Sequence, residues 1–185
     1  MSILVTGGAR SGKSSFAERW IMANTDQAVY VATAQAFDQE MKERIALHKH
    51  QRDHADFTWR TVEEPVGLSE LLRSLRSEAE APAVLVDCLT LWLSNVILAA
   101  EEQEDMEQSI RAAIDELVAE VKEYPGPLVL VTNEVGDGIV PEYPLGRLFR
   151  DYAGILNQSV ARVCGQVFLV TVGIPIELKS REYRL

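Results

Sequence analysis

The sequence lacks the features that mark membrane-spanning, secreted and disulfide-stapled proteins. No apolar run approaches the ~20 residues that a membrane-spanning helix needs. The amino terminus has neither a basic segment nor a long apolar one, so we expect no secretory signal and a cytoplasmic protein. Only two cysteines occur, Cys88 and Cys164, and their spacing matches no metal site. We expect two buried thiols in a reducing compartment.

Basic residues are also scarce. The chain has 18 Lys and Arg against 28 Asp and Glu, a net charge of -10. Non-specific affinity for nucleic acid comes from Lys and Arg on phosphates, so this composition argues against nucleic acid as a partner. An anionic ligand must instead be held by groups gathered at one binding site, and not by the electrostatic field of the whole protein. The length of 185 residues and the apolar content of 47% predict a single globular domain spanning residues 1–185.

Short apolar segments alternate with helical patterns along the chain. We expect strands at residues 3–6, 28–33, 83–87, 127–132 and 166–172, with a short extended piece at 57–65. Helices are expected at residues 13–24, 38–51, 67–79, 89–100, 105–124 and 145–164. The alternation predicts an α/β fold, a mostly parallel sheet with helices on both faces. Ligands of such sheets bind at the carboxyl ends of the strands, here in loops 6–13, 33–38, 87–90 and 132–144.

The stretch TGGARSGKSS follows the first expected strand and opens the first expected helix. It contains G-x-x-x-x-G-K-S, the spacing at which a glycine-rich loop wraps backbone N–H groups around phosphate oxygens. Lys13 supplies a charge to the outer phosphates, and the Ser14 hydroxyl is placed to bind Mg²⁺. The motif predicts a nucleoside triphosphate site made by Gly7, Gly8, Ala9, Arg10, Ser11, Gly12, Lys13 and Ser14.

Polar residues end two further strands at the same edge of the expected sheet. Asp87 ends the apolar run AVLVD and is a candidate ligand of Mg²⁺, although it is equally placed to cap the next helix. Thr132, Asn133 and Glu134 follow another strand, where Asn133 is also compatible with a simple turn. No T-K-x-D-type guanine motif occurs. These residues alone do not distinguish a kinase, an ATPase and a GTPase.

All three histidines lie within seven residues, in the segment LHKHQRDH. A solvated helix end suits His50 and His54. A metal site would lack supporting cysteines or paired carboxylates. The third interpretation is a nucleophile that attacks phosphorus and forms a phosphoramidate. On a helix, Arg44, His48 and Arg52 share one stripe, so two guanidiniums would gather phosphate oxygens around His48 and disfavour its protonation.

The segments ILVTGGARSGKSSFAE, YVATAQAFDQEMKERIALHKHQR, WRTVEEP, LVDCLTLWLSN and LVTNEVGDGIVPEYPLGRLFRDYAGILNQ follow one another in this order. The chain closely resembles the bifunctional adenosylcobinamide kinase / adenosylcobinamide-phosphate guanylyltransferases of cobalamin biosynthesis. The resemblance implies that ATP or GTP phosphorylates the aminopropanol hydroxyl of adenosylcobinamide. GMP from GTP then passes to that phosphate through a guanylylated histidine. It also implies Mg²⁺, a RecA-like phosphate-loop fold and a homo-oligomer, with a trimer as the expected form.

The resemblance further assigns single residues. His48 carries the guanylyl group, and Lys13 stabilises charge on the outer phosphates. Nucleotide contacts are implied for Ala32, Thr33, Ala34, Lys49, His50, Gln51, Arg52, Glu63 and Asp87. Glu63 and Glu64 are adjacent, which leaves the acting carboxylate open. The family often has Arg-Pro where this chain has Arg52-Asp53, so this loop lacks the rigidity that proline gives.

Two other function classes share a phosphate loop. A kinase for another small molecule would need no guanylylated histidine. A motor-type nucleotide switch would need a partner surface, for which the acidic helix near residues 104–123 is available. Neither gives the segment RIALHKHQR a role. The corrinoid-binding residues carry no motif. The Gly- and Pro-rich loop 134–144 is a candidate, and it is equally compatible with a plain connection.

Overall fold

The computed structural model describes residues 1–35 and 57–183. Its strands are β1 (Ser2–Thr6), β2 (Gln27–Ala32), β3 (Thr58–Glu63), β4 (Ala83–Asp87), β5 (Leu128–Val131), β6 (Gln166–Thr171) and β7 (Ile174–Glu177). Its helices are α1 (Lys13–Asn24), α3 (Leu68–Arg76), α4 (Leu89–Ala100), α5 (Met106–Glu123) and α6 (Pro144–Val163), followed by the short 3₁₀ helix η1 (Lys179–Arg181). The helix expected at 38–51 lies outside the described residues.

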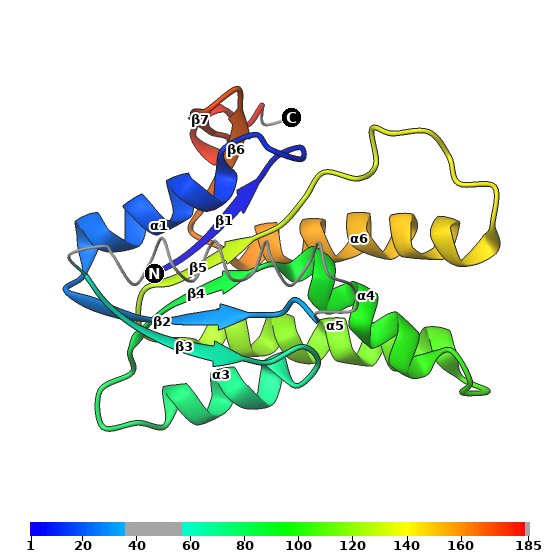
Figure 1. Cartoon of the computed structure of the whole chain (residues 1–185), viewed down its shortest axis with the longest axis horizontal. Coiled ribbons are helices and arrows are strands. Elements are labelled where there is room, and N and C mark those ends of the chain that lie inside the picture. Colours follow the sequence, from blue (N-terminus) through cyan, green and yellow to red (C-terminus); the bar gives the residue numbers. More distant parts are fainter. Residues whose placement is uncertain (36–56, 184–185) are drawn as a thin grey trace.

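The strands form one sheet in the order β3-β2-β4-β5-β1-β6-β7 (Figure 1). Every neighbouring pair is parallel except β6 and β7. The extended piece expected at 57–65 is a full partner of β2, as strand β3. The predicted mostly parallel sheet is therefore confirmed. The carboxyl ends of its parallel strands meet at a single edge.

Alternate residues of each central strand enter two different cores. In β5, Leu128 and Leu130 pack with α3, α4, α5 and α6, whereas Val129 and Val131 pack on the opposite face, which α1 covers. Figure 1 shows α1 on one side of the sheet and α3 and α5 on the other. All four of these β5 side chains are buried because both faces are covered. Helices on both faces are thus confirmed.

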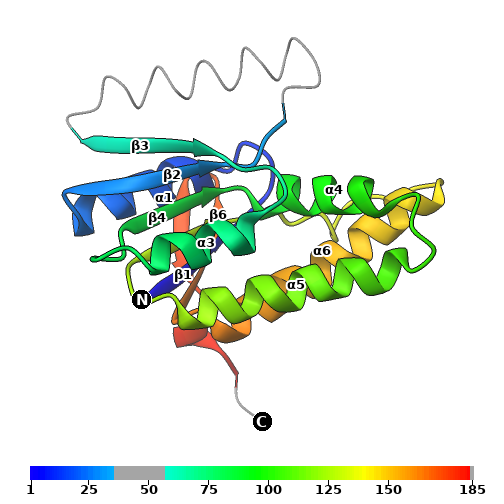
Figure 2. The ribbon, with the colours of Figure 1, turned by 90° about the horizontal axis from the view of Figure 1, so that it is seen from below.

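The helices of the larger layer are held by apolar stripes and by ion pairs. Helix α5 buries Ile110, Leu117 and Val121 along one face, and it lies beside α6 (Figure 2). Arg73 of α3 reaches Glu120 of α5 at 2.8 Å, and Arg73 also reaches Glu116. No helix within residues 1–35 and 57–183 is long and apolar enough to cross a membrane.

Strand β7 is absent from the sequence prediction. It joins β6 through a two-residue turn in which both Val172 and Gly173 have positive φ, at 48° and 81°. Such turns match the twist of a hairpin, and their usual sequence signals are Asn-Gly and Asp-Gly. The dipeptide here begins with a β-branched residue, so the pattern gave no hairpin signal. The helix expected at 67–79 also ends earlier, at Arg76.

The core of the larger layer can be tested with two leucines of α4. Leu93 is fully buried, whereas Leu98 is 47% exposed on the same helix. We expect Leu93→Ala to lower the free energy of unfolding by about 2–5 kcal/mol, because it leaves a cavity. Leu98→Ala makes the same chemical change at the surface and should cost less than about 1 kcal/mol. Urea titrations measure both; equal losses would contradict the described packing.

Candidate functional site

The predicted ligand-binding loops, within the described residues 1–35 and 57–183, all begin at the carboxyl edge of the sheet. In register, Ala32 at the end of β2 pairs with Glu63 of β3 on one side and with Asp87 of β4 on the other. Asp87 in turn pairs with Val131 of β5, which also pairs with Val5 of β1. The structure therefore brings together the ends of five strands from distant parts of the sequence, with the phosphate-loop segment directly after β1.

The loop between β1 and α1 has the backbone of an anion cradle. Gly12 precedes α1 with a φ of 94°, and Arg10 also has a positive φ, of 56°. The loop closes on itself through Ser11, whose N–H donates to the carbonyl of Gly8 at 3.3 Å. No side chain caps the start of α1 at Gly12. An uncapped helix start that follows a curled glycine loop suits phosphate.

The same loop is pressed against the carboxyl end of β6 and the turn that follows. A Cβ atom at Gly7 would lie 2.4 Å from the carbonyl oxygen of Val170. A Cβ at Gly12 would lie 3.3 Å from the Cα of Gly173, in a backbone conformation that already favours glycine. The N–H of Gly173 donates to the carbonyl of Ser11 at 2.8 Å. Both glycines of the motif are thus required by close approach.

Lys13 is almost fully buried, with 8% of its surface exposed. Its Nζ donates to the carbonyl of Gly8 at 3.1 Å, which places the ammonium group over the start of the loop. The predicted loop residues are therefore assembled as one unit. The positive charge lies where outer phosphates are bound in phosphate loops.

Strands β2 and β4 are joined at their ends by Thr33. The Thr33 hydroxyl donates to the carbonyl of Cys88 at 2.7 Å and accepts from the N–H of Cys88. Asp87 accepts a hydrogen bond from the Tyr30 hydroxyl at 3.2 Å, and no side-chain bond caps α4. The alternative role of Asp87 as a helix cap is therefore not realised. Its carboxylate stays at the ligand-binding edge.

Cys88 lies in the same corner and is buried, as is Cys164, and both are free thiols as expected. Burial, and then the negative charge of Asp87, raise the pKa of the Cys88 thiol to about 11. At neutral pH the thiol therefore stays protonated and is a poor nucleophile. Cys88 is a packing residue of the site.

The structure also separates the two adjacent glutamates at the carboxyl end of β3. The Glu64 carboxylate accepts the N–H groups of Val66 at 3.1 Å and Gly67 at 2.7 Å, immediately before α3. Glu63 is exposed at the end of β3, in register with Ala32. Glu64 thus organises a chain turn, and Glu63 is the carboxylate left at the ligand-binding edge.

Asn95 is a positioning residue that the sequence analysis missed. Its side-chain amide donates to the carbonyl of Thr33 at 2.9 Å and to the carbonyl of Pro65 at 3.0 Å. It thereby ties the loops after β2 and β3 to helix α4. The available signal was a lone amide within the apolar helix LTLWLSNVILAA. A buried amide must find hydrogen-bond partners, and loop carbonyls supply them.

A second unpredicted network holds the loop after β5. Asn133 donates its backbone N–H to the Thr90 hydroxyl at 2.8 Å, and its carbonyl accepts from the side-chain amide of Asn157 at 3.2 Å. Thr132 donates to the Asn157 side chain at 2.7 Å and lies 3.3 Å from the Thr90 hydroxyl. Asn133 is therefore bound to both α4 and α6, which is more than a simple turn requires.

The remaining predicted residues lie outside the described part of the chain. They are His48, Lys49, His50, Gln51 and Arg52, together with the Arg44 stripe. Their predicted roles therefore remain predictions.

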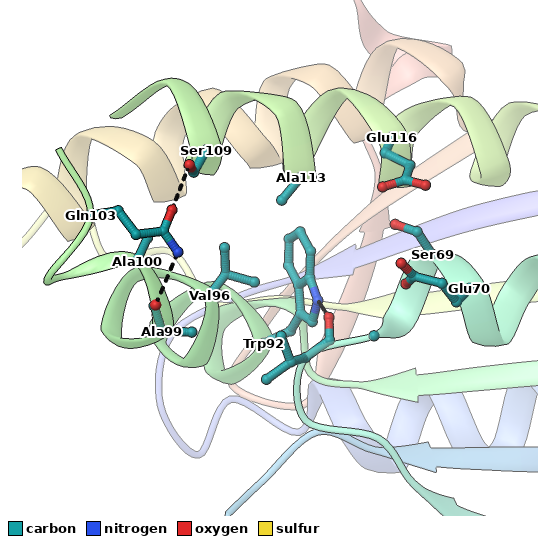
Figure 3. Close-up of a pocket in the computed structure, with 12 residues that line it drawn as sticks. Ser69, Glu70, Trp92, Val96, Ala99, Ala100, Gln103, Ser109, Ala113 and Glu116 are labelled. Atoms are coloured by element: carbon teal, nitrogen blue, oxygen red, sulfur yellow. Dashed lines mark hydrogen bonds between the residues drawn. The ribbon is translucent and has the colours of Figure 1, made fainter. Parts of the chain in front are cut away.

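A separate pocket of about 230 Å³ lies between α3, α4 and α5 (Figure 3). Trp92 points into this space from α4, and its indole N–H donates to the carbonyl of Val66 at 2.8 Å. Gln103 and Ser109 are joined by a hydrogen bond at the other end. None of the predicted nucleotide-binding residues that fall within residues 1–35 and 57–183 lines this pocket.

The fold matches that of a solved structure described as a prototypical ATPase from the type III secretion system of pathogenic bacteria. The TM-score is 0.52 at 14% identity, over all of this chain and 58% of the other. At this identity the likeness concerns the fold alone. Together with the phosphate loop and the strand order, it supports a RecA-like phosphate-loop architecture.

Comparisons of sequence are more specific. The bifunctional adenosylcobalamin biosynthesis protein CobP of Pseudomonas aeruginosa is 46% identical over 97% of this chain and 98% of its own length. The proteins CobU of Escherichia coli and of Salmonella typhimurium, named likewise, are 43% and 42% identical, each over 97% of this chain and 100% of its own. A model of the cobinamide kinase / cobinamide phosphate guanyltransferase family matches residues 3–178. The chain therefore belongs to the cobinamide kinase / cobinamide phosphate guanyltransferase family.

Proposed function

We propose that this protein phosphorylates the aminopropanol hydroxyl of adenosylcobinamide with ATP or GTP. It then transfers GMP from GTP to that phosphate through His48, which gives adenosylcobinamide-GDP and pyrophosphate. Membership of the family supports both reactions. The observation that carries the proposal is the closed loop of residues 7–14, with the Lys13 ammonium group over its start.

The phosphate loop serves both steps by stabilising negative charge. In the kinase step the γ-phosphoryl group leaves the β-phosphate, and in guanylyl transfer pyrophosphate leaves the α-phosphorus. In both, charge grows on the outer phosphates, where Lys13 and the backbone N–H groups of the loop are in place before the reaction. Mg²⁺, held by Ser14 and Asp87 together with substrate phosphates, would neutralise part of that charge.

The nucleoside is expected to extend along the carboxyl edge away from the loop. Ala32 ends β2 in register with Glu63 at the end of β3, and Thr33 and Ala34 follow Ala32. These residues would line the nucleotide, with Lys49 to Arg52 beside the guanylylated His48. His48 attacks the α-phosphorus, and the bond from that phosphorus to the pyrophosphate oxygen breaks. The corrinoid phosphate then attacks the phosphoramidate and releases His48.

The corrinoid is expected on the loop after β5. This loop begins at the network around Asn133 and exposes three large apolar side chains, Ile139, Val140 and Tyr143. The loop is attached to helix α6, because Arg147 and Arg150 of that helix donate hydrogen bonds to the carbonyls of Glu142 and Gly136. An apolar surface on a loop that begins at the phosphate loop, where Glu134 contacts Gly7, suits a large macrocycle. We further propose a single domain, a homo-oligomer, in the form of a trimer, and a cytoplasmic location.

Lys13→Ala tests the shared role of the loop. We expect both phosphorylation and guanylyl transfer to fall by about 100-fold or more, because one preorganised charge is lost in each transition state. Lys122→Ala, an exposed lysine of α5, is the matched control and should behave as wild type. Unaltered kinase turnover in Lys13→Ala would show that the loop is not the phosphate site.

Denaturation after incubation with Mg²⁺ and GTP labelled at the α-phosphate tests the covalent step. We expect label on the wild-type protein that is labile in acid and stable in base, as for a phosphoramidate. It should disappear in His48→Asn and persist in His54→Asn. If the wild-type protein carried no label, the guanylyl-histidine intermediate would be refuted, and the protein would be a kinase without guanylyltransferase activity.

The two glutamates at the carboxyl end of β3 are expected to have different roles, Glu63 in nucleotide binding and Glu64 in stability. Glu63→Gln should weaken GTP binding by about tenfold or more, because a hydrogen bond to a charged group is lost. Glu64→Ala removes the acceptor for two N–H groups before α3, so it should lower the free energy of unfolding by about 1 kcal/mol. Calorimetric titration measures GTP binding, and urea unfolding measures stability. Weaker GTP binding in Glu64→Ala together with lower stability in Glu63→Gln would contradict our assignment.

A further inference from the structure

Glu134 lies against the start of the phosphate loop, although no motif of the sequence assigns it a role. Its N–H donates to the carbonyl of Gly7 at 3.3 Å. Its carboxylate oxygen Oε1 accepts a hydrogen bond from the Thr6 hydroxyl at 2.5 Å. Both contacts join the loop after β5 to the residues where β1 becomes the phosphate loop. The carboxylate is therefore fixed at this point by backbone and side chain together.

The preceding residue reinforces this position. Asn133 is hydrogen-bonded to Thr90 of α4 and to Asn157 of α6, so the backbone that carries Glu134 is anchored from two sides. Glu134 itself is exposed to solvent. Among residues 1–35 and 57–183, no donor reaches its second carboxylate oxygen, Oε2. One oxygen is thus used for orientation, and the other is open to a bound molecule.

The Lys13 ammonium group marks where the outer phosphates lie. Its Nζ is 3.1 Å from the carbonyl oxygen of Gly8, the residue after Gly7, to whose carbonyl Glu134 is bound. Lys13 and Glu134 therefore converge on the same end of the loop. A carboxylate beside a triphosphate is repelled by it and weakens nucleotide binding. A carboxylate at such a position is expected where it holds a metal ion, as proposed for Asp87, or where it accepts a proton.

Phosphoryl transfer to an alcohol requires such a proton acceptor. As the hydroxyl oxygen of the acceptor bonds to the γ-phosphorus, its proton must leave, and a carboxylate within hydrogen-bond reach takes it. Guanylyl transfer to the corrinoid phosphate has no such requirement, because the attacking oxygen is already anionic. A carboxylate at the γ-phosphate end of the loop thus serves one of the two reactions and leaves the other unaided.

We propose that Glu134 is the general base of the kinase step, an assignment that rests on the proposed function. The acceptor O–H gives its proton to Oε2 of Glu134, and its oxygen forms a bond to the γ-phosphorus. The bond from the γ-phosphorus to the bridging oxygen breaks, and the nucleoside diphosphate leaves with that electron pair. Glu134 then returns the proton to water. His48 acts on the α-phosphorus in the other reaction, so the two reactions use different protein groups around one triphosphate.

Glu134→Gln separates this proposal from the proposed function, because the amide keeps the shape of the side chain and loses its basicity. Two rates are measured in the same preparation: transfer of γ-phosphate to adenosylcobinamide, and labelling of the protein by GTP carrying label at the α-phosphate. We expect the first rate to fall about 100-fold or more and the second to stay within about twofold of wild type. Glu134→Asp should restore part of the kinase rate, and Glu102→Gln, an exposed glutamate after α4, should alter neither rate.

The split between kcat and KM gives a second readout that a merely structural role would not move. Glu134→Gln should lower the kcat of the kinase step without raising the KM for the nucleotide, because the amide keeps the shape of the side chain and loses only its basicity. Kinase activity near the wild-type rate in Glu134→Gln would overturn the proposal, as would equal loss of both activities. Absence of both activities in the wild type would instead refute the proposed function.

Discussion

The site depends on the close approach of the phosphate loop to strand β6 and the turn that follows it. Gly7 passes so near the carbonyl of Val170 that a Cβ atom has no room, and Gly12 takes a left-handed conformation against Gly173. The hydrogen bond from Gly173 to Ser11 completes this contact. The antiparallel hairpin at the edge of the sheet therefore supports the curvature that turns backbone N–H groups toward an anion.

The other elements of the edge are fixed relative to that loop by neutral hydrogen bonds. Thr33 joins β2 to the residue after β4, Asn95 joins the loops after β2 and β3 to α4, and Asn133 joins the loop after β5 to α4 and α6. The charged groups Lys13, Asp87 and Glu134 are carried by this frame. We propose that this neutral frame holds the charged groups in position for two phosphorus atoms of one triphosphate.

Much of this arrangement could be predicted from the sequence. The motif at residues 6–15 and the alternation of buried strands with helices predicted the curled glycine loop, the parallel sheet and the edge where its strands end, because these patterns are local. Hairpin β6–β7 was not predicted, because Val172 is an unusual residue for such a turn. The sequence did not predict the positioning roles of Asn95, Thr90 and Asn157, because their hydrogen-bond partners are distant in sequence. The distinction between Glu63 and Glu64 also needed the fold, because only there does Glu64 meet the turn before α3.

We propose that a single triphosphate, bound in the preformed loop, is presented to two different protein groups. A crystal structure with Mg²⁺ and a non-hydrolysable GTP analogue tests it most directly. We expect the outer phosphates to lie against Lys13 and the loop N–H groups, with the loop backbone unchanged. The α-phosphorus should face His48, and Glu134 should lie at the γ-phosphate end. A triphosphate bound outside residues 7–14, or one whose α-phosphorus lies beyond the reach of His48, would contradict this proposal.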